Sequence, residues 1–571
     1  MDISYRYAKK IKIFTTAFSC CIAIILSRLL YLQIVHNDNF FAMSVKNFLR
    51  TETIASPRGN IIDCNGILLA TNRPITTLYW HGTGNSSLTL KQQEMIQTIE
   101  AIVGPIDRSK VNRTEQRTSK LLLAHDISFV QLSKIIELFP NNKNIHFSTN
   151  FKRFYPNQKT ASHILGHLSS FNNFENRGKM GLEKILHDTL QGQQGQLVKT
   201  INSLGISMEQ EEIKTALPGK DIQTTLDINL QKLTEDLFPE KFNGAFILMN
   251  PKNGAIRALV SRPNFDPSVF LDPIAEPEWS VLQNGNPFLN RAFNACYPPA
   301  SIFKLICISA ALENKSITQE DTITCSGHFR FKGRRHYCMR RSGHGTLTIQ
   351  DAVAKSCNIL FYEIATRMPI DILADYAFRF GLGKKTNLIF PEQEGLVPTP
   401  SWKHATKGER WWPGETLSCS IGQSYLLATP IQIACMISSI FEGYLVTPRI
   451  LESEPFNFRP LAIASSTRKF LRKSMKSAVQ VGTGTEVSKI EDIKVFAKTG
   501  TAQVVELSSN NDKNQPKAHS WFVAYFSYKD HEPLTLVILL EHTGNSQPSK
   551  LFAKRFLMSY RKYMKNKYSA E

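Results

Sequence analysis

A long apolar run near the N-terminus constrains this chain most. Residues 13–35 contain one charge, Arg28, and these 23 residues form about 34 Å of helix, enough to cross a bilayer once. The flank before the run is basic, with Arg6, Lys9, Lys10 and Lys12 against one acid, Asp2. Positive residues favour the cytoplasmic side. We therefore expect residues 1–12 to be a cytoplasmic tail, 13–35 a transmembrane helix and the remainder to be extracytoplasmic.

A cleaved signal peptide is the alternative interpretation of this run. The apolar stretch is longer than the usual core of a signal peptide, and no A-x-A-like cleavage site follows it. No second apolar run of comparable length occurs, so we expect a single-pass protein.

The net charge of the chain limits the kinds of binding partner that we expect. The net charge of +20, from 68 Lys and Arg against 48 Asp and Glu, would suit nucleic acid or an anionic surface. An extracytoplasmic location removes most of the nucleic-acid interpretation, so we expect no nucleic-acid partner. The 10 cysteines in 571 residues are too few for a disulfide framework, and any cysteine cluster must be judged by its spacing.

The chain after the apolar run divides near Pro218. Residues 36–217 have modest hydrophobicity and many Asn, Gln and Lys, with short strand-like and helical pieces, which is typical of a platform. Residues 218–571 carry stronger periodic patterns. The strand patterns occupy 244–260, around the turn Asn253-Gly254, then 519–528 and 534–542; the helical patterns occupy 302–312 and 360–367. This order predicts an α+β domain with a mostly antiparallel sheet flanked by helices.

The tetrad Ser301-Ile302-Phe303-Lys304 follows two prolines and opens an apolar helix. Residues at i and i+3 of a helix share a face, which places a hydroxyl beside an amine. An alcohol is a poor nucleophile until a neighbouring base takes its proton, and a lysine against apolar walls can lose its own proton near neutral pH. The pattern alone is weak, because S-x-x-K also occurs at Ser466 and Lys469.

Two further motifs strengthen the interpretation. Ser356-Cys357-Asn358 lies 55 residues after Ser301, and Lys498-Thr499-Gly500-Thr501 follows a strand-like stretch 142 residues later and leads into a predicted strand at 502–505. A glycine at that position lets a substrate backbone approach closely. Each motif alone is weak evidence, but the three motifs in this order are strong evidence for a serine–lysine active site.

The three motifs together resemble those of a penicillin-binding protein, in which the active-site serine motif is followed by S-x-N and K-T-G. The resemblance implies that Ser301 is the acylated nucleophile and Lys304 the base or proton shuttle. It further implies roles for Ser356 and Asn358 as proton relay and substrate-amide contact, for Lys498 and Thr499 as donor-carboxylate contacts, and for Gly500 and Thr501 in substrate binding. The backbone N–H groups of Ser301 and Thr501 would form the oxyanion hole. No cofactor is required for this chemistry.

Motifs in the N-terminal half resemble those of the class B pedestal, also known as the dimerisation domain. They are residues 56–63 with Asn65-Gly66, then residues 153–156, 161–163 and 181–183. Cys64 stands where this pattern usually has Arg. Class B enzymes are transpeptidases without a glycosyltransferase domain. The segments 333–345, 411–430 and 482–484 look most like the elongation-specific subclass, the penicillin-binding protein 2 type, rather than the septal one.

A second constellation lies beside the S-x-N motif. Cys325, Cys338, His344 and Cys357 follow the spacing C-x12-C-x5-H-x12-C, and four such ligands suit tetrahedral zinc. Some elongation-type relatives have a metal site in this region, so the resemblance implies a structural Zn²⁺. A Cys325–Cys338 disulfide and unrelated buried thiols are the two other interpretations of these residues.

The resemblance implies a peptidoglycan D,D-transpeptidase of the inner membrane, with its bulk in the periplasm. Its expected partners are stem peptides, lipid-linked nascent glycan, β-lactams and a SEDS-family membrane glycosyltransferase of the elongation complex. The alternatives are a septal class B transpeptidase, a β-lactam sensor and a catalytically silent scaffold. A sensor would need several spans and a cytoplasmic effector, and a silent scaffold would have lost Ser301 or Lys304. A β-lactamase would need a water-activating base, which these motifs do not supply.

Overall fold

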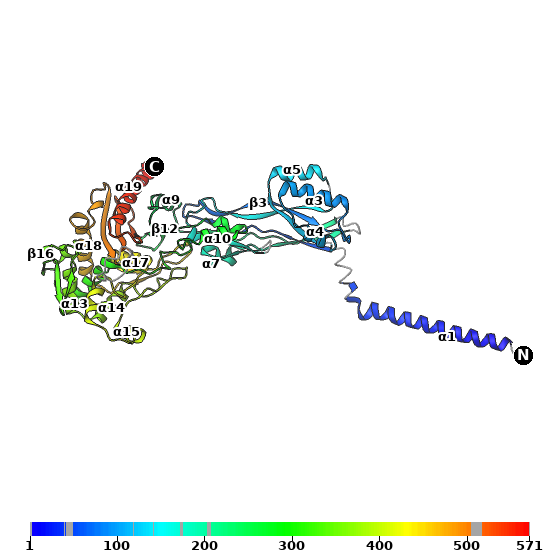
Figure 1. Ribbon diagram of the computed structural model, residues 1–571, viewed down its shortest axis with the longest axis horizontal. Coiled ribbons are helices and arrows are strands. Elements are labelled where there is room, and N and C mark those ends of the chain that lie inside the picture. The colour runs from blue at the N-terminus through cyan, green and yellow to red at the C-terminus, as the bar shows by residue number, and fades with distance from the viewer. Residues whose placement is uncertain are drawn as a thin grey trace. The chain divides into compact units, whose positions relative to one another are not determined.

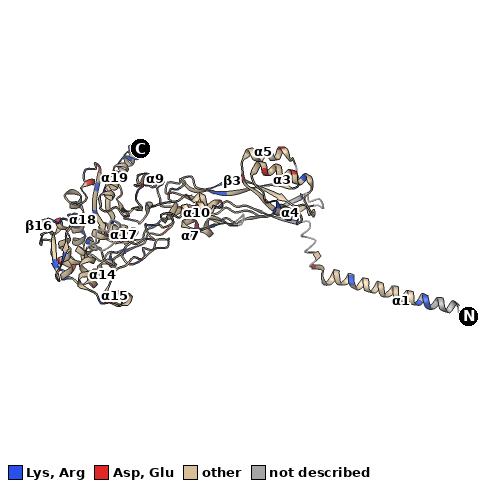
Figure 2. Ribbon diagram, in the orientation of Figure 1, with Lys and Arg blue, Asp and Glu red and all other residues tan. Residues whose placement is uncertain are grey.

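The computed structural model describes residues 3–38, 40–41, 49–117, 119–140, 142–171, 175–201, 207–503 and 517–569. The first helix, α1 (Ile3–Leu30), continues into a π-helical turn, η1 (Tyr31–Val35). The stretch Lys9–Ile34, which runs through α1 into η1, is long and apolar enough to cross a membrane. Among the described residues, no other helix is both long and apolar enough to do so. Its charged residues are Lys9, Lys10 and Lys12 at one end and Arg28 near the other, with uncharged residues between them (Figure 2). The predicted apolar helix is confirmed.

The chain forms two compact units that do not follow chain order. The N-terminal unit comprises Met1–Arg58, Arg73–Lys152 and Gln191–Gly219. The catalytic unit comprises Gly59–Asn72, Arg153–Leu190 and Lys220–Glu571. The catalytic unit thus includes two segments of the platform region in addition to the C-terminal part of the chain.

The N-terminal unit contains two β-structures. One is an antiparallel sheet of β1 (Leu49–Ile54), β8 (Gly195–Ile201) and β9 (Ser207–Lys214). In the other, β4 (Lys120–Ile127) and β5 (Ile145–Phe154) pair with β3 (Leu68–His81); β3 belongs to this unit from Arg73 onward and β5 up to Lys152. Three helices of this unit are α3 (Leu90–Val103), α4 (Arg108–Glu115) and α5 (Phe129–Leu138). Buried apolar side chains such as Leu78, Trp80 and Ile99 form their shared core.

The platform segments of the catalytic unit meet around one buried ion pair. Arg153 Nε lies 2.7 Å from Glu183 Oε1, and Arg153 also donates a 2.7 Å hydrogen bond to the Gly59 carbonyl. Asp63 accepts hydrogen bonds from the backbone of Ile67 and Ile228, at 2.8 and 3.1 Å. The residues that resemble pedestal motifs therefore hold these distant segments together. A buried charge needs such a partner, because desolvation of an unpaired ion is costly.

A five-stranded antiparallel sheet forms the centre of the catalytic unit (Figure 1). Its order is β12 (Ile256–Arg262), β11 (Gly244–Met249), β21 (Leu534–Leu540), β20 (His519–Tyr528) and β19 (Ile493–Ala502). The predicted α+β class and antiparallel sheet are confirmed. The last strand ends at Leu540 instead of His542, because His542 adopts φ of +53°, which an extended strand does not allow.

Helices cover both faces of this sheet, and β11 and β21 are buried at every position. Successive residues alternate between the faces. Ile247 and Val537 join the core that includes α17 (Pro430–Glu442), whereas Phe246 and Ile538 join the core that includes α9 (Ile228–Leu237) and α19 (Gln547–Ser569). The final helix α19 packs against β20 and β21 and therefore closes one side of the sheet (Figure 1).

Replacing Phe556 in α19 tests this packing. Phe556 is fully buried, with its ring centroid 4.8 Å from that of Phe246. Phe556→Ala should lower the free energy of unfolding by about 3–5 kcal/mol, since the cavity cannot collapse completely. Thermal and urea unfolding of the full chain in detergent would measure the loss. Leu551→Ala on the same helix, at a side chain that is 47% exposed, is the control and should change stability by less than about 1 kcal/mol. Equal losses in both variants would contradict the packing.

Candidate active site

Ser301 lies in a tight turn at the start of a buried helix. The turn is the 3₁₀ segment η3 (Ala300–Ile302), and α11 (Lys304–Glu313) follows it directly. Ala300 adopts φ of +49°, a left-handed conformation that is uncommon for a residue other than glycine and is concentrated at functional sites. Its N–H donates a 2.8 Å hydrogen bond to the Gly422 carbonyl. A Cβ at Gly422 would lie 2.0 Å from the Ala300 oxygen, so the absence of a side chain there permits the turn.

Lys304 is fully buried one turn along the helix. Its Nζ donates to the Ser356 carbonyl at 2.9 Å, to Ser356 Oγ at 3.2 Å and to Asn358 Oδ1 at 2.6 Å. Burial disfavours the charged form and lowers the pKa of Lys304 to about 8. A lysine with this pKa exists partly as the free amine near neutral pH, as a general base requires.

The second motif occupies the turn between α12 (Ile349–Ala354) and α13 (Asn358–Arg367). Ser356 has φ of +56°, so this turn is also in the left-handed region. Asn358 uses its Oδ1 to accept from Lys304 and its Nδ2 to donate to the Tyr337 carbonyl at 3.1 Å. The amide orientation is therefore fixed by two partners of opposite hydrogen-bonding type.

The third motif lies on the edge strand β19, beside the nucleophile turn. A Cβ at Gly500 would lie 3.5 Å from both Ile302 Cγ1 and the Pro299 oxygen. Lys498 is buried, and its Nζ donates to Ser356 Oγ at 3.0 Å. Burial and the neighbouring Lys304 charge hold the pKa of Lys498 well below its usual range. The Ser356 hydroxyl therefore lies between two buried amines.

The third motif also includes Thr499, near the end of β19. Thr499 Oγ1 donates to Thr483 Oγ1 at 2.7 Å. Of the predicted strand 502–505, Ala502 is the last strand residue, Gln503 is not in a strand, and residues 504 and 505 lie outside the described residues. Within the described chain β19 pairs with β20 alone, so its other edge can accept an extended substrate.

All three predicted motifs converge, and the geometry suits nucleophilic acyl transfer. Ser301 is half-buried, and no described residue makes a hydrogen bond to its Oγ. Hydrogen bonds between catalytic groups often tighten only when substrate binds, so a free hydroxyl beside a desolvated base is compatible with this role. The proposed oxyanion donors, the backbone N–H groups of Ser301 and Thr501, remain predictions.

Sequence reasoning missed three residues that support the site. Gly422 supports the nucleophile turn, Thr483 bonds Thr499, and Tyr337 accepts from Asn358. Gly422 and Thr483 fall in the segments 411–430 and 482–484 that suggested the elongation subclass, and Tyr337 falls in 333–345. The sequence therefore marked the segments that contain these residues, but it did not indicate what each residue does.

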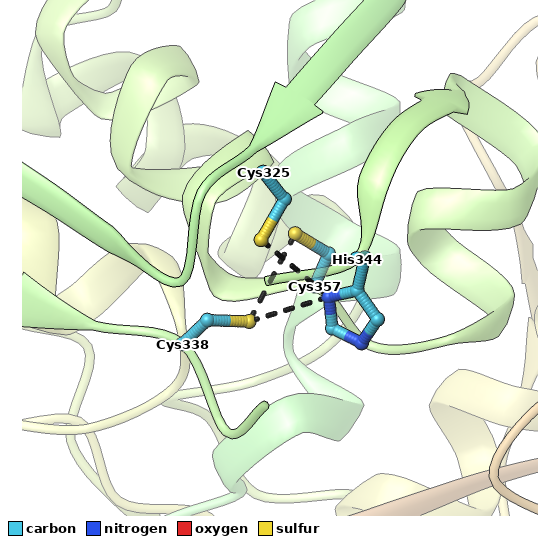
Figure 3. A group of neighbouring side chains, drawn as sticks. All are labelled: Cys325, Cys338, His344 and Cys357. Carbon is cyan, nitrogen blue, oxygen red and sulfur yellow. Dashed lines mark hydrogen bonds between the residues drawn. The ribbon is translucent and has the colours of Figure 1, made fainter. Parts of the chain in front are cut away.

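The predicted Cys/His cluster also comes together (Figure 3). His344 Nδ1 lies 3.5 Å from Cys325 Sγ and 3.6 Å from Cys338 Sγ, and Cys338 Sγ lies 4.0 Å from Cys357 Sγ. The four ligand atoms all lie within 4.8 Å of one another, so the cluster could hold a metal ion. Cys325 and Cys338 are free thiols, so the alternative disulfide does not form in this structure.

Known proteins resemble this chain along most of its length. Residues 244–557 match the family model of the penicillin binding protein transpeptidase domain, and residues 53–224 match that of the penicillin-binding protein dimerisation domain. The peptidoglycan D,D-transpeptidase MrdA of Acinetobacter baumannii is 28% identical over 572 residues, covering 94% of this chain and 84% of that protein.

Solved structures of penicillin-binding proteins also resemble this chain along most of its length. Penicillin-binding protein 2 of Helicobacter pylori, in complex with MreC, has a TM-score of 0.77 at 28% identity and covers 90% of this chain and 99% of its own. A chain of a peptidoglycan synthase complex has a TM-score of 0.73 at 27% identity and covers 96% of this chain and 98% of its own. Since the transpeptidase match alone spans more than half of the sequence, the chain belongs to the penicillin-binding protein transpeptidase family, in its class B, elongation-specific branch.

Proposed function

We propose that this protein cross-links the stem peptides of peptidoglycan during cell-wall elongation, as a serine-type D-Ala-D-Ala transpeptidase. The observation that carries the proposal is the convergence of Lys304, Ser356 and Lys498 directly beside the turn that presents Ser301. Two desolvated amines at one hydroxyl supply both a base and a positive charge without any cofactor.

The first step forms an ester. Ser301 Oγ attacks the carbonyl carbon of the penultimate D-Ala, and its proton passes to the Lys304 amine. The tetrahedral intermediate then collapses with cleavage of the peptide C–N bond. The departing D-Ala amine takes a proton, which Ser356 can relay because its hydroxyl contacts both lysines, at 3.2 and 3.0 Å. Lys498 and Thr499 hold the donor carboxylate, and Gly500 and Thr501 align the donor along β19.

The second step forms the cross-link. An acceptor amine attacks the ester carbonyl carbon, its proton returns through Lys304 to the serine oxygen, and the C–O bond breaks to release an amide and the free Ser301 hydroxyl. β-Lactams imitate the donor, since attack on the strained ring leaves an acyl ester on the same oxygen.

The membrane arrangement follows from α1. We assign residues 1–12 to the cytoplasm, 13–35 to a single inner-membrane span, 36–217 to the pedestal and 218–571 to the transpeptidase domain in the periplasm. The basic flank of α1 supports this orientation. One structural neighbour is in a complex with MreC, and another belongs to a peptidoglycan synthase complex. These neighbours support partners in an elongation complex. We propose that a SEDS-family glycosyltransferase is one of these partners and that the two enzymes share lipid-linked nascent glycan as substrate.

We further propose that the Cys/His cluster binds a structural Zn²⁺. Tetrahedral zinc with Zn–S near 2.3 Å and Zn–N near 2.0 Å needs ligand atoms separated by roughly 3.5–3.8 Å. The separations of 3.5 and 3.6 Å between His344 Nδ1 and two thiols lie within that range, and the 4.0 Å between Cys338 Sγ and Cys357 Sγ lies just above it. Bound zinc would brace Cys357, and with it the turn that holds Ser356, and would take no part in the acyl-transfer steps.

Labelling with a fluorescent penicillin tests the nucleophile. Ser301→Ala should reduce covalent labelling to background, because no other hydroxyl lies in the turn before Lys304. Ser466→Ala, in the second S-x-x-K sequence, is the matched control and should label like the parent protein. Equal labelling of the parent and Ser301→Ala proteins would refute the assignment.

The pH dependence of acylation tests Lys304. Below its pKa of about 8 the lysine is protonated and cannot accept the Ser301 proton, so the acylation rate should rise about tenfold per pH unit and level off above pH 8. Stopped-flow acylation rates across this range provide the measurement. A rate that is independent of pH through this range would rule out Lys304 as the base.

Metal analysis tests the zinc proposal. The purified full chain should contain about one equivalent of zinc, and His344→Ala should lose most of it, since three ligands hold zinc less tightly than four. His328→Ala, at a histidine outside the cluster, should retain the metal. Absence of zinc from the parent protein would refute the proposal of a structural zinc site.

A further inference from the structure

A hairpin beside the second motif carries concentrated positive charge. It consists of β14 (His328–Phe331) and β15 (Arg334–Tyr337). The segment 326–345 contains no Asp or Glu and six basic residues, which are Arg330, Lys332, Arg334, Arg335, Arg340 and Arg341. All six are exposed, and none of them forms an ion pair with any residue that the structure describes. They are therefore available to an external anion.

The arrangement of these charges works against the hairpin's own stability. Arg330 and Arg335 are direct cross-strand partners, and like charges in such pairs are destabilising. Tyr337 shares a face with Arg335 by strand alternation, and the Arg341 guanidinium carbon lies 3.8 Å from the centroid of its ring. We call Arg330, Arg335, Arg341 and Tyr337 the basic face.

Contacts on the opposite face fix the hairpin in place. The rings of Phe329 and His336 lie 6.0 and 5.5 Å from that of Tyr362 in α13, measured between centroids. The Cys/His cluster brings both ends of the hairpin segment to Cys357. The basic face is thus held beside the catalytic turn and is not a free surface loop.

A short chain of hydrogen bonds links the basic face to the base. The Tyr337 carbonyl accepts from Asn358 Nδ2 at 3.1 Å, and Asn358 Oδ1 accepts from Lys304 Nζ at 2.6 Å. A residue of the basic face is thus separated from Lys304 by a single side chain, Asn358.

We propose that the basic face binds the carboxylates of the acceptor stem peptide. This inference rests on the proposed function, in which the donor carboxylate already has its own cation, Lys498. The acceptor is a second peptide with its own carboxylates, and arginine is the side chain best suited to bind a carboxylate through two parallel hydrogen bonds. A field of one sign at the mouth of a site also raises the local concentration of an anionic substrate.

The test uses the partition of the acyl-enzyme between amine and water. A thioester donor acylates the full-length protein, and amide product is measured against hydrolysed donor. The acceptor is an amine-bearing peptide with free carboxylates, or the same peptide with its carboxylates amidated. Arg330→Glu/Arg335→Glu should lower the amide-to-hydrolysis ratio at least about fivefold with the free-carboxylate acceptor, and little with the amidated one. Lys554→Glu/Arg555→Glu, two exposed α19 positions with the same change in charge, is the control and should leave the ratio unchanged.

Penicillin labelling of the same samples distinguishes failure of the acceptor-binding inference from failure of the proposed transpeptidase function. Normal labelling with an unchanged ratio in the hairpin variant would overturn the acceptor role and leave the transpeptidase assignment intact. Absence of Ser301-dependent labelling in the parent protein would overturn the proposed function instead. If the double variant fails to label, Arg335→Gln alone removes one charge without repulsion and should shift the ratio in the same direction. An unchanged ratio, with lost binding to phosphatidylglycerol vesicles, would identify a membrane contact and refute the inference.

Discussion

The burial of Lys304 is the constraint on which the active site depends. A fully buried ammonium must find partners for its three N–H groups, because desolvation would otherwise cost several kcal/mol. The Ser356 carbonyl, Ser356 Oγ and Asn358 Oδ1 provide three acceptors, all from the second motif. Since α11 is buried along nearly its whole length and cannot shift, the second motif must fold back onto it. One buried charge thus fixes the relation between two segments more than fifty residues apart.

The same hydrogen bonds define how a proton can move. When Lys304 loses its proton, its nitrogen becomes an acceptor, and neither the Ser356 carbonyl nor Asn358 Oδ1 can donate to it. Among the three partners only the Ser356 hydroxyl can reverse its role. That hydroxyl also accepts from Lys498, so the two lysines communicate through a single rotatable O–H group. The S-x-N motif needs a serine for this reversal and an amide for fixed orientation.

Much of the site could be predicted from the sequence, because each motif is local. The serine and lysine share one helical turn, and the cluster that includes Cys325 and His344 is indicated by residue type and spacing. Residues whose role depends on a distant segment could not be predicted. The left-handed Ala300 turn requires Gly422, and Thr499 bonds Thr483. The segments around both partners resembled the elongation subclass, but nothing in the local sequence showed which distant residue each partner contacts. The compact units also cross chain order, because short strands such as β2 (Ile61–Ile62) and β10 (Ile222–Gln223) pair across a long separation.

The two buried lysines would couple the proposed binding of the donor carboxylate to the chemistry at Ser301. Each ammonium disfavours the charged state of the other, and Lys304 is among the causes of the depressed pKa of Lys498. A donor carboxylate beside Lys498 favours the protonated form of that lysine. With the Lys498 charge retained, the least favourable remaining proton in the buried pair is the one on Lys304, and its loss produces the base. If Lys498 holds the donor carboxylate as proposed, substrate binding at the third motif favours the reactive protonation state at the first, through the hydroxyl supplied by the second.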